Sequence, residues 1–220
     1  MYIAKYIDHT LLKATATTKD IEQLCFEAIK HHFYAVCINP CYISLCKNIL
    51  TNSNVNIATV VGFPLGAMQA KSKLYEAEQA IHTGANEIDM VLNIGFLKSN
   101  LYQEVEDEIT TIKKSIGEHT LKVIIETCYL TREEKITATR IVLNSGADFI
   151  KTSTGFGTGG ATFEDILLFK EIAGNNLKIK ASGGIKDAET AMKYISLGVS
   201  RIGTSSGVDI VQGKISNSNY

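Results

Sequence analysis

The chain has 220 residues, of which 45% are hydrophobic, and its 22 basic side chains nearly balance its 23 acidic ones. This length and composition suffice for one α/β barrel, and the balanced charge argues against nucleic acid or an anionic membrane as a partner. No apolar run is long enough to span a bilayer and the N-terminal stretch lacks a signal-peptide core, so we expect a cytoplasmic protein.

Strand-like and helix-like segments alternate along the whole chain. The predicted strands cover 6–9, 35–39, 57–62, 87–92, 122–126, 149–152, 178–181 and 201–203. The predicted helices cover 17–32, 41–51, 68–83, 97–116, 131–145, 162–174, 187–197 and 206–213. Eight strands, each followed by a helix, predict an α/β fold with a single (β/α)8 TIM-barrel domain over residues 1–220. A doubly wound open sheet is the alternative, and residues 214–220 are expected to form a flexible polar tail.

A weak internal repeat indicates which strand residues face the barrel axis. The segments are GANEID (84–89), GADFIK (146–151) and GVSRIG (198–203), each with an isoleucine before its last residue. Strand side chains alternate between the two faces of a sheet. If the isoleucines pack against helices, Asp89, Lys151 and Gly203 point inward. The same alternation turns Lys180 and Cys37 inward.

Two lysines on different strands, Lys151 and Lys180, are the strongest candidates for chemistry. An interior lysine loses the solvation of its charge, which favours the neutral amine, and a second ammonium nearby lowers its pKa further. Lowering a lysine pKa from about 10.4 to about 7 takes on the order of 4–5 kcal/mol, and the neutral amine can then form a Schiff base with a carbonyl. The alternatives are a lysine whose stem extends to water and a structural ion pair with Asp89. Such a pair leaves the second lysine unexplained.

The glycine-rich run 155–160 has the spacing of a dinucleotide-binding motif. Gly155, Gly157 and Gly160 form GxGxxG between a predicted strand and a predicted helix. A dinucleotide site also has an acidic residue about twenty positions later, at the end of the next strand, where this chain has Lys178 and Lys180. We therefore do not expect a dinucleotide cofactor.

The ends of the last two strands are rich in small residues and hydrogen-bond donors. Their sequences are KASGGI (180–185) and RIGTSSG (201–207). In barrels, the loops after the seventh and eighth strands, with a short helix N-terminus, commonly hold a phosphate. We therefore expect a phosphate near Gly183, Gly184, Gly203, Ser205 and Ser206. Ordinary tight turns are the alternative.

The cysteines and histidines predict neither disulfides nor a metal site. The five cysteines are an odd number without CxxC spacing, so we expect reduced thiols. The five histidines lie on scattered segments, and no cluster with carboxylates or cysteines has the spacing of a metal site. We expect chemistry without a metal.

Seven segments together resemble the deoxyribose-phosphate aldolases. They are DHTLLK (8–13), VCINP (36–40), VGFPLG (61–66), EIDMVLN (87–93), FIKTSTG (149–155), KASGGI (180–185) and RIGTSS (201–206). The resemblance implies a TIM barrel and a class I aldolase without metal or cofactor. Such an enzyme reversibly cleaves 2-deoxy-D-ribose 5-phosphate to D-glyceraldehyde 3-phosphate and acetaldehyde. Its expected partners are these small molecules and further copies of the chain.

The resemblance also assigns roles to individual residues. It makes Lys151 the Schiff-base lysine, Lys180 the lysine that perturbs it and joins proton transfer, and Asp89 a proton shuttle. The residues that it places around the substrate and its phosphate are Asp8, Cys37, Thr152, Gly155, Gly183, Gly184, Gly203, Ser205 and Ser206. The chain has Phe156 where some members have a lysine, which reduces the positive charge near the phosphate. Some members use a terminal tyrosine in proton transfer, which makes Tyr220 a candidate donor.

Two other functions remain open from the sequence. Another Schiff-base lyase, or a transaldolase-like enzyme, would act on a different sugar phosphate and prefer a ketone donor. A non-catalytic barrel that binds a sugar phosphate would keep its ligand after Lys151→Ala. A binding protein has no need of two interior lysines beside an aspartate, which favours the enzyme.

Overall fold

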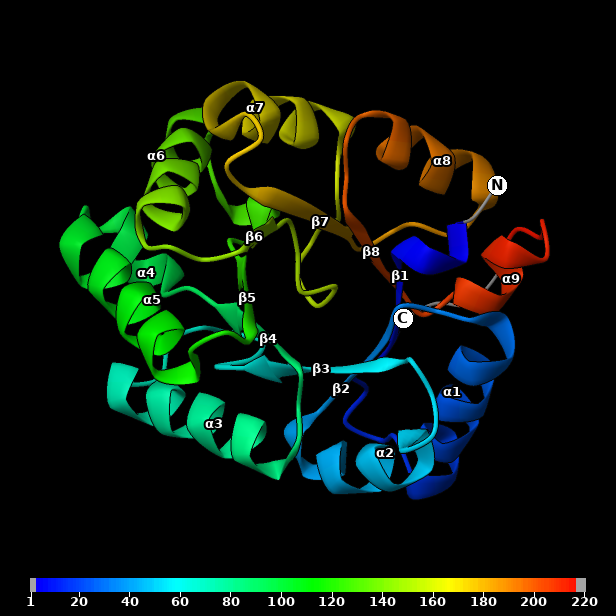
Figure 1. Ribbon diagram of the computed structural model, residues 1–220. Helices are drawn as coiled ribbons and strands as arrows, with labels where there is room; N and C mark the ends of the chain where they lie inside the picture. Colours follow the sequence, from blue (N-terminus) through cyan, green and yellow to red (C-terminus); the bar gives the residue numbers. More distant parts are fainter. Residues whose placement is uncertain (1–2, 217–220) are drawn as a thin grey trace.

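Eight parallel strands form a closed barrel in which each strand pairs with the next and β8 pairs with β1 (Figure 1). The structure is a computed structural model and describes residues 3–216. The strands are β1 (Ile7–Leu11), β2 (Ala35–Ile38), β3 (Asn56–Val61), β4 (Glu87–Val91), β5 (Thr120–Ile124), β6 (Phe149–Lys151), β7 (Lys178–Ser182) and β8 (Arg201–Thr204). The predicted (β/α)8 barrel is confirmed, and the open sheet is wrong.

Helices connect the strands and form a ring around the barrel (Figure 1). They are α1 (Thr18–His31), α2 (Ile43–Leu50), α3 (Ala70–Thr83), α4 (Ile94–Lys98), α5 (Tyr102–Ile116), α6 (Arg132–Asn144), α7 (Phe163–Ala173), α8 (Ala188–Ser196) and α9 (Gly207–Val211). Short 3-10 helices cover Ile3–Tyr6, Pro40–Tyr42 and Thr127–Tyr129. The single helix predicted over 97–116 is wrong. Asn100 has a φ of 60°, a left-handed conformation that a right-handed helix cannot continue, so α4 and α5 are separate.

Polar side chains cap several helices at their predicted starts, including α6 and α7. The Thr131 hydroxyl accepts a hydrogen bond from the Glu134 N–H at 3.2 Å, and the Glu134 carboxylate accepts one from the Thr131 N–H at 2.7 Å. This reciprocal pair is a capping box. The Thr162 hydroxyl accepts from the Asp165 N–H at 3.1 Å. These caps fix where the chain leaves the loops that follow β5 and β6 and turns back along the barrel.

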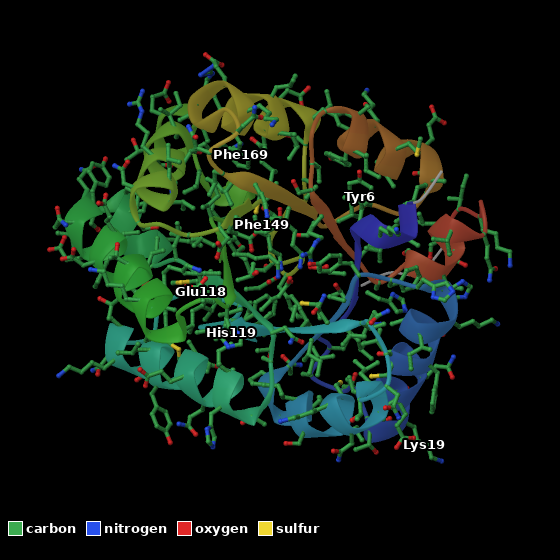
Figure 2. The ribbon with its side chains drawn as sticks, viewed as in Figure 1. Tyr6, Lys19, Glu118, His119, Phe149 and Phe169 are labelled. Atoms are coloured by element: carbon green, nitrogen blue, oxygen red, sulfur yellow. The ribbon has the colours of Figure 1, made fainter. Side chains whose placement is uncertain are left out.

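Side chains that point outward from the strands form the main core with the helices. Ile88, Ile150 and Ile202 are fully buried in this layer, which confirms the faces that the internal repeat predicts. Figure 2 shows Phe169 between α7 and the barrel, whereas Lys19 lies on the outer surface of α1. A smaller apolar cluster lies inside, formed by Leu12, Ala35, Cys37, Ala58 and Val60. The remaining interior positions are therefore available for polar side chains.

The five cysteines are free thiols, as expected. The sulfur atoms of Cys25 on α1 and Cys46 on α2 lie 3.6 Å apart. Within residues 3–216, no helix combines the length and the apolar character needed to cross a membrane. Tyr220 and most of the predicted tail lie outside the described residues.

Candidate active site

The barrel encloses a cluster of buried charged side chains from six strands. Its carboxylates belong to Asp8, Glu87 and Asp89, and its cations to Lys122, Lys151, Lys180 and Arg201, each at most 5% exposed. Within the described part of the chain, the cluster thus holds four cations and three carboxylates. Unbalanced buried charge is costly, so loss of one proton from one lysine would bring the cluster to neutrality.

Asp89 lies at the centre of this cluster. Its Oδ2 accepts hydrogen bonds from Lys151 Nζ at 2.8 Å and from Lys180 Nζ at 2.7 Å. Its Oδ1 accepts one from Lys122 Nζ at 2.7 Å. Because Lys151 and Lys180 share one oxygen, their nitrogen atoms lie within the range of about 4–6 Å over which charges shift each other's pKa strongly. The predicted grouping of two lysines around Asp89 is therefore present.

Further ion pairs within the cluster involve Asp8 and Glu87. Lys180 Nζ donates to Asp8 Oδ2 at 2.5 Å, and Arg201 donates to Asp8 Oδ1 at 2.9 Å. The Arg201 guanidinium also donates to both Glu87 oxygens, at 2.9 and 3.1 Å. Lys122 lies 2.6 Å from Glu87. These pairs fix Lys180 and Asp8 in place, because a displaced partner would leave a buried charge uncompensated.

The pKa of Lys151 shifts in the direction that favours a nucleophile. Burial lowers the pKa of Lys151, because the charged form loses its solvation. The Asp89 carboxylate opposes this shift, and the ammonium of Lys180 adds to it. The net direction is downward, so the neutral amine is more populated than in an ordinary lysine.

The other two lysines of the cluster keep their protons. Burial disfavours the charge of Lys180, but Asp8 and Asp89 outweigh burial and raise the pKa of Lys180. Burial likewise acts against Lys122, whose pKa Asp89 and Glu87 nevertheless raise. Burial favours protonated Asp89, yet the three lysines hold its pKa well below the usual range. The surplus proton therefore leaves most readily from Lys151.

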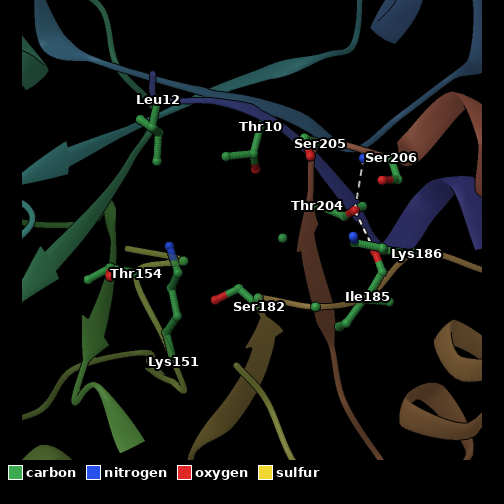
Figure 3. A pocket seen from close by; sticks show the side chains of 14 residues that line it. Thr10, Leu12, Lys151, Thr154, Ser182, Ile185, Lys186, Thr204, Ser205 and Ser206 are labelled. Carbon is green, nitrogen blue, oxygen red and sulfur yellow. Dashed lines mark hydrogen bonds between the residues drawn. The ribbon is translucent and has the colours of Figure 1, made fainter. Parts of the chain in front are cut away.

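A cavity opens above this cluster, at the carboxyl ends of the strands. Figure 3 shows Lys151 reaching from β6 into this cavity, with Thr10 and Ser182 on its sides. The lining residues are Thr10, Leu12, Lys151, Thr154, Gly155, Ser182, Gly183, Gly184, Ile185, Lys186, Gly203, Thr204, Ser205 and Ser206. In TIM-barrel enzymes the active site normally lies at the carboxyl ends of the strands, which is the end where this cavity opens.

Glycines shape the part of the cavity that is formed by the ends of β7 and β8 and the loops after them. Gly183 and Gly184 have φ values of 85° and 78°, which residues with a Cβ rarely adopt. A Cβ at Gly203 would lie 3.0 Å from Lys180 Cε, so glycine there leaves room for the lysine stem. The Thr204 hydroxyl donates to the Ile185 carbonyl at 2.8 Å and accepts from the Ser206 N–H at 3.0 Å, which ties the two loops together (Figure 3).

The predicted site residues fall into three groups. Those that line the cavity are Lys151, Gly155, Gly183, Gly184, Gly203, Ser205 and Ser206. Those in or against the charge cluster beneath it are Asp8, Asp89, Lys180 and Cys37, whose sulfur lies 3.9 Å from Asp89 Oδ2. Thr152 is fully buried, and its hydroxyl donates to the Ser182 carbonyl at 3.1 Å, which joins β6 to β7. Tyr220 lies outside the described residues.

Several residues at the site were not predicted. In the cluster these are Glu87, Lys122 and Arg201, and around the cavity Thr10, Leu12, Thr154, Ser182, Ile185, Lys186 and Thr204. The strand alternation already contained a signal for two of them. Glu87 lies two positions before Asp89, on the same face of β4, and Lys122 pairs with Asp89 across β4 and β5. Lys186, a basic residue, also lines the cavity.

Comparisons with known proteins agree with this geometry. Residues 2–213 match the sequence profile described as DeoC/LacD family aldolase. A deoxyribose-phosphate aldolase of Finegoldia magna is 55% identical over 213 residues, which cover 97% of this chain and all of that protein.

Solved structures give the same result. A putative deoxyribose-phosphate aldolase from Coccidioides immitis has a TM-score of 0.94 and 37% identity, over 96% of this chain and 85% of that one. The deoxyribose phosphate aldolase from Aeropyrum pernix, described as a unique tetramer, has a TM-score of 0.86 and 30% identity, over 96% of this chain and 89% of that one. Full-length similarity at this level, in sequence and in fold, shows that the chain belongs to the DeoC/LacD family of aldolases, which are lyases.

Proposed function

We propose that this aldolase reversibly cleaves 2-deoxy-D-ribose 5-phosphate to D-glyceraldehyde 3-phosphate and acetaldehyde, through a Schiff base on Lys151. One observation carries the proposal. Lys151 is the member of the charge cluster that both reaches the cavity and has a lowered pKa. An amine in that state is a nucleophile toward an aldehyde carbon.

The reaction begins with addition of the neutral amine of Lys151 to the aldehyde carbon of the open-chain sugar. Water leaves from the resulting carbinolamine, and a cationic iminium remains. A cation at this position restores the charge that the cluster had before Lys151 lost its proton. The buried carboxylate of Asp89, 2.8 Å from Lys151 Nζ, stabilises that cation.

The iminium then accepts the electron pair of the breaking carbon–carbon bond. A base removes the proton of the hydroxyl on the third carbon, the bond between the second and third carbons breaks, and D-glyceraldehyde 3-phosphate forms. The two remaining carbons stay on Lys151 as an enamine. Protonation of the enamine carbon and hydrolysis of the new iminium release acetaldehyde and regenerate the amine.

Asp89 and Lys180 supply the proton transfers in this scheme. Each step needs a group near the reacting atoms that can give or take a proton. Lys180 holds its proton as an ammonium between Asp8 and Asp89, and a water in the cavity would carry protons between this pair and the substrate. Cys37 borders the pair, and Asp8 keeps Lys180 in place.

The phosphate of the substrate would bind to the loops after β7 and β8. Backbone N–H groups near Gly183 and Gly184 and the hydroxyls of Ser205 and Ser206 are suitable donors at this end of the cavity. Lys186 lines the same region and supplies positive charge. This arrangement also orients the aldehyde end of the substrate toward Lys151.

Trapping with borohydride tests the proposal directly. Acetaldehyde and borohydride should ethylate Lys151, a gain of about 28 Da by covalent arithmetic on the Schiff base. Peptide mapping by mass spectrometry should find this gain on the peptide that contains Lys151. An unmodified protein, or an adduct on another lysine, would contradict the proposal. Cleavage of 2-deoxy-D-ribose 5-phosphate in preference to ketose phosphates would separate this reaction from that of a transaldolase-like enzyme.

Lys180→Met should move the pH dependence of Schiff-base formation to higher pH. The ammonium of Lys180 lowers the pKa of Lys151, and it competes for the Asp89 oxygen that favours protonated Lys151. Without Lys180, both effects raise the pKa of Lys151, so less neutral amine is present at pH 7. The rate of borohydride trapping with acetaldehyde, measured against pH, checks this shift separately from turnover. Lys114→Met on the exposed face of α5 should leave the profile unchanged, and an unmoved or acid-shifted profile for Lys180→Met would contradict the coupling.

A further inference from the structure

Glu126 is a buried acidic residue two positions after the end of β5, and it has no role in the scheme above. It is 2% exposed, although acidic residues are rarely buried without a purpose or partner. Its backbone has a φ of 51°, a left-handed conformation that costs a residue with a Cβ about 1–2 kcal/mol. Such a conformation persists where surrounding contacts determine it.

The Glu126 carboxylate holds the loop that follows Lys151. Its two oxygens accept the Thr154 N–H at 3.2 and 3.3 Å, and Oε2 also accepts a short hydrogen bond from the Thr154 hydroxyl. The loop packs closely on this carboxylate, because a Cβ at Gly157 would lie 3.1 Å from Glu126 Cδ and 2.8 Å from Cys128 Sγ. Glycine at position 157 therefore allows the loop to lie this close to Glu126 and Cys128, because a larger residue would collide with them.

These contacts fix the direction of the Thr154 hydroxyl group. A threonine hydroxyl has one proton to donate and two acceptor positions. The proton goes to Glu126, and one acceptor position is taken by the Phe156 N–H at 2.9 Å. Thr154 lines the cavity beside Lys151 (Figure 3), so its second acceptor position remains for a donor in the cavity.

We propose that Glu126 is a positioning residue, whose carboxylate orients the Thr154 hydroxyl to accept a hydrogen bond from a hydroxyl group of the substrate. The inference rests on the proposed function, since 2-deoxy-D-ribose 5-phosphate carries hydroxyl groups between its aldehyde carbon and its phosphate. Glu126 acts through Thr154 and does not itself line the cavity.

The backbone of β6 is held independently of this carboxylate. The Ile125 N–H donates to the Lys151 carbonyl at 3.1 Å, and the Thr127 N–H donates to the Thr152 carbonyl at 2.9 Å. Glu126→Gln, a substitution of almost equal size, should therefore leave Lys151 in place while changing the hydrogen bonding of Thr154. The variant should therefore bind the hydroxylated substrate more weakly but react with acetaldehyde, which has no hydroxyl group, as the parent does.

Steady-state cleavage of 2-deoxy-D-ribose 5-phosphate and acetaldehyde trapping, measured on the same samples, test the inference. Glu126→Gln and Thr154→Val should each raise KM about three- to tenfold, the effect of a lost hydrogen bond between neutral groups, with a smaller change in kcat. The trapping rate at Lys151 should stay within about twofold of the parent. The double variant should be no worse than Thr154→Val alone, because both changes remove one interaction. Thr154→Ser should recover most of the loss.

Matched variants make the result decisive. Cys128→Ala removes only the weak contact of a thiol 3.9 Å from Glu126 Oε1 and should keep the parent KM. Glu126→Asp, which keeps the charge but is too short to reach Thr154, should behave like Glu126→Gln. A parent-like KM in both Glu126 variants, additive losses in the double variant, or loss of trapping together with the KM effect would each overturn the inference. Absence of a Lys151 adduct in the parent would instead overturn the proposed function.

Discussion

Lys151→Met should lower kcat by at least about 10⁴-fold, on the scale seen when a covalent nucleophile is removed. No other lysine of the cluster reaches the cavity with a lowered pKa, within the described residues, so none can replace it. The same variant should fold with an unfolding free energy within about 1 kcal/mol of the parent, or higher. Removal of the Lys151 ammonium leaves three cations and three carboxylates in the cluster, and the methionine side chain, of similar length, fills the space.

Kinetics and urea unfolding together check this prediction. The combination of lost turnover and kept stability distinguishes a nucleophile from one member of a structural ion pair, whose removal would destabilise the fold. Lys151→Met should also show no mass gain with acetaldehyde and borohydride. A kcat lowered by less than about 10⁴-fold, or a loss of several kcal/mol in stability, would contradict the role assigned to Lys151.

Asp89→Asn should destabilise the folded protein by about 3–5 kcal/mol, the usual cost of leaving a buried charge without its partner. Lys122, Lys151 and Lys180 all donate to this carboxylate, and an asparagine offers them one neutral oxygen. The cluster would then hold four cations and two carboxylates. The midpoint of urea unfolding at neutral pH should fall accordingly, and turnover should be lost.

A compensating variant provides the control for Asp89. Asp89→Asn combined with Lys122→Met returns the cluster to one surplus cation, so it should recover part of the lost stability without recovering activity. Cys37→Ala, next to the same carboxylate, removes no charge and should cost far less than Asp89→Asn. Equal stability of Asp89→Asn and the parent would show that Asp89 is not the shared counterion.

The same count of charges explains how the site prepares a nucleophile. A cluster with equal numbers of cations and carboxylates would hold every lysine charged. Here one cation is in excess, and the lysine with fewest carboxylate contacts, Lys151, carries the lowered pKa. Lys180 pairs with two carboxylates and keeps its proton. Preparation of the nucleophile is thus a property of the whole cluster.

The sequence alone determined the barrel and the central residues of the site. Alternating strands and helices predict the fold, and the two-residue period of strands turns Asp89, Lys151 and Lys180 inward, because both are local properties of the chain. The motif around Lys151 identified the family. Local patterns also placed the glycine and serine loops at the end of the barrel where the cavity opens.

Only the tertiary structure decided which charges meet and how they are balanced. Arg201 and Asp8 are separated by 193 positions, and Lys180 and Asp8 by 172, so no local pattern indicates that they form ion pairs. The clamp of Glu126 on Thr154 likewise joins two loops, through a backbone conformation that sequence propensity disfavours. Distance and burial set the pKa of a buried lysine, and closure of the barrel fixes both.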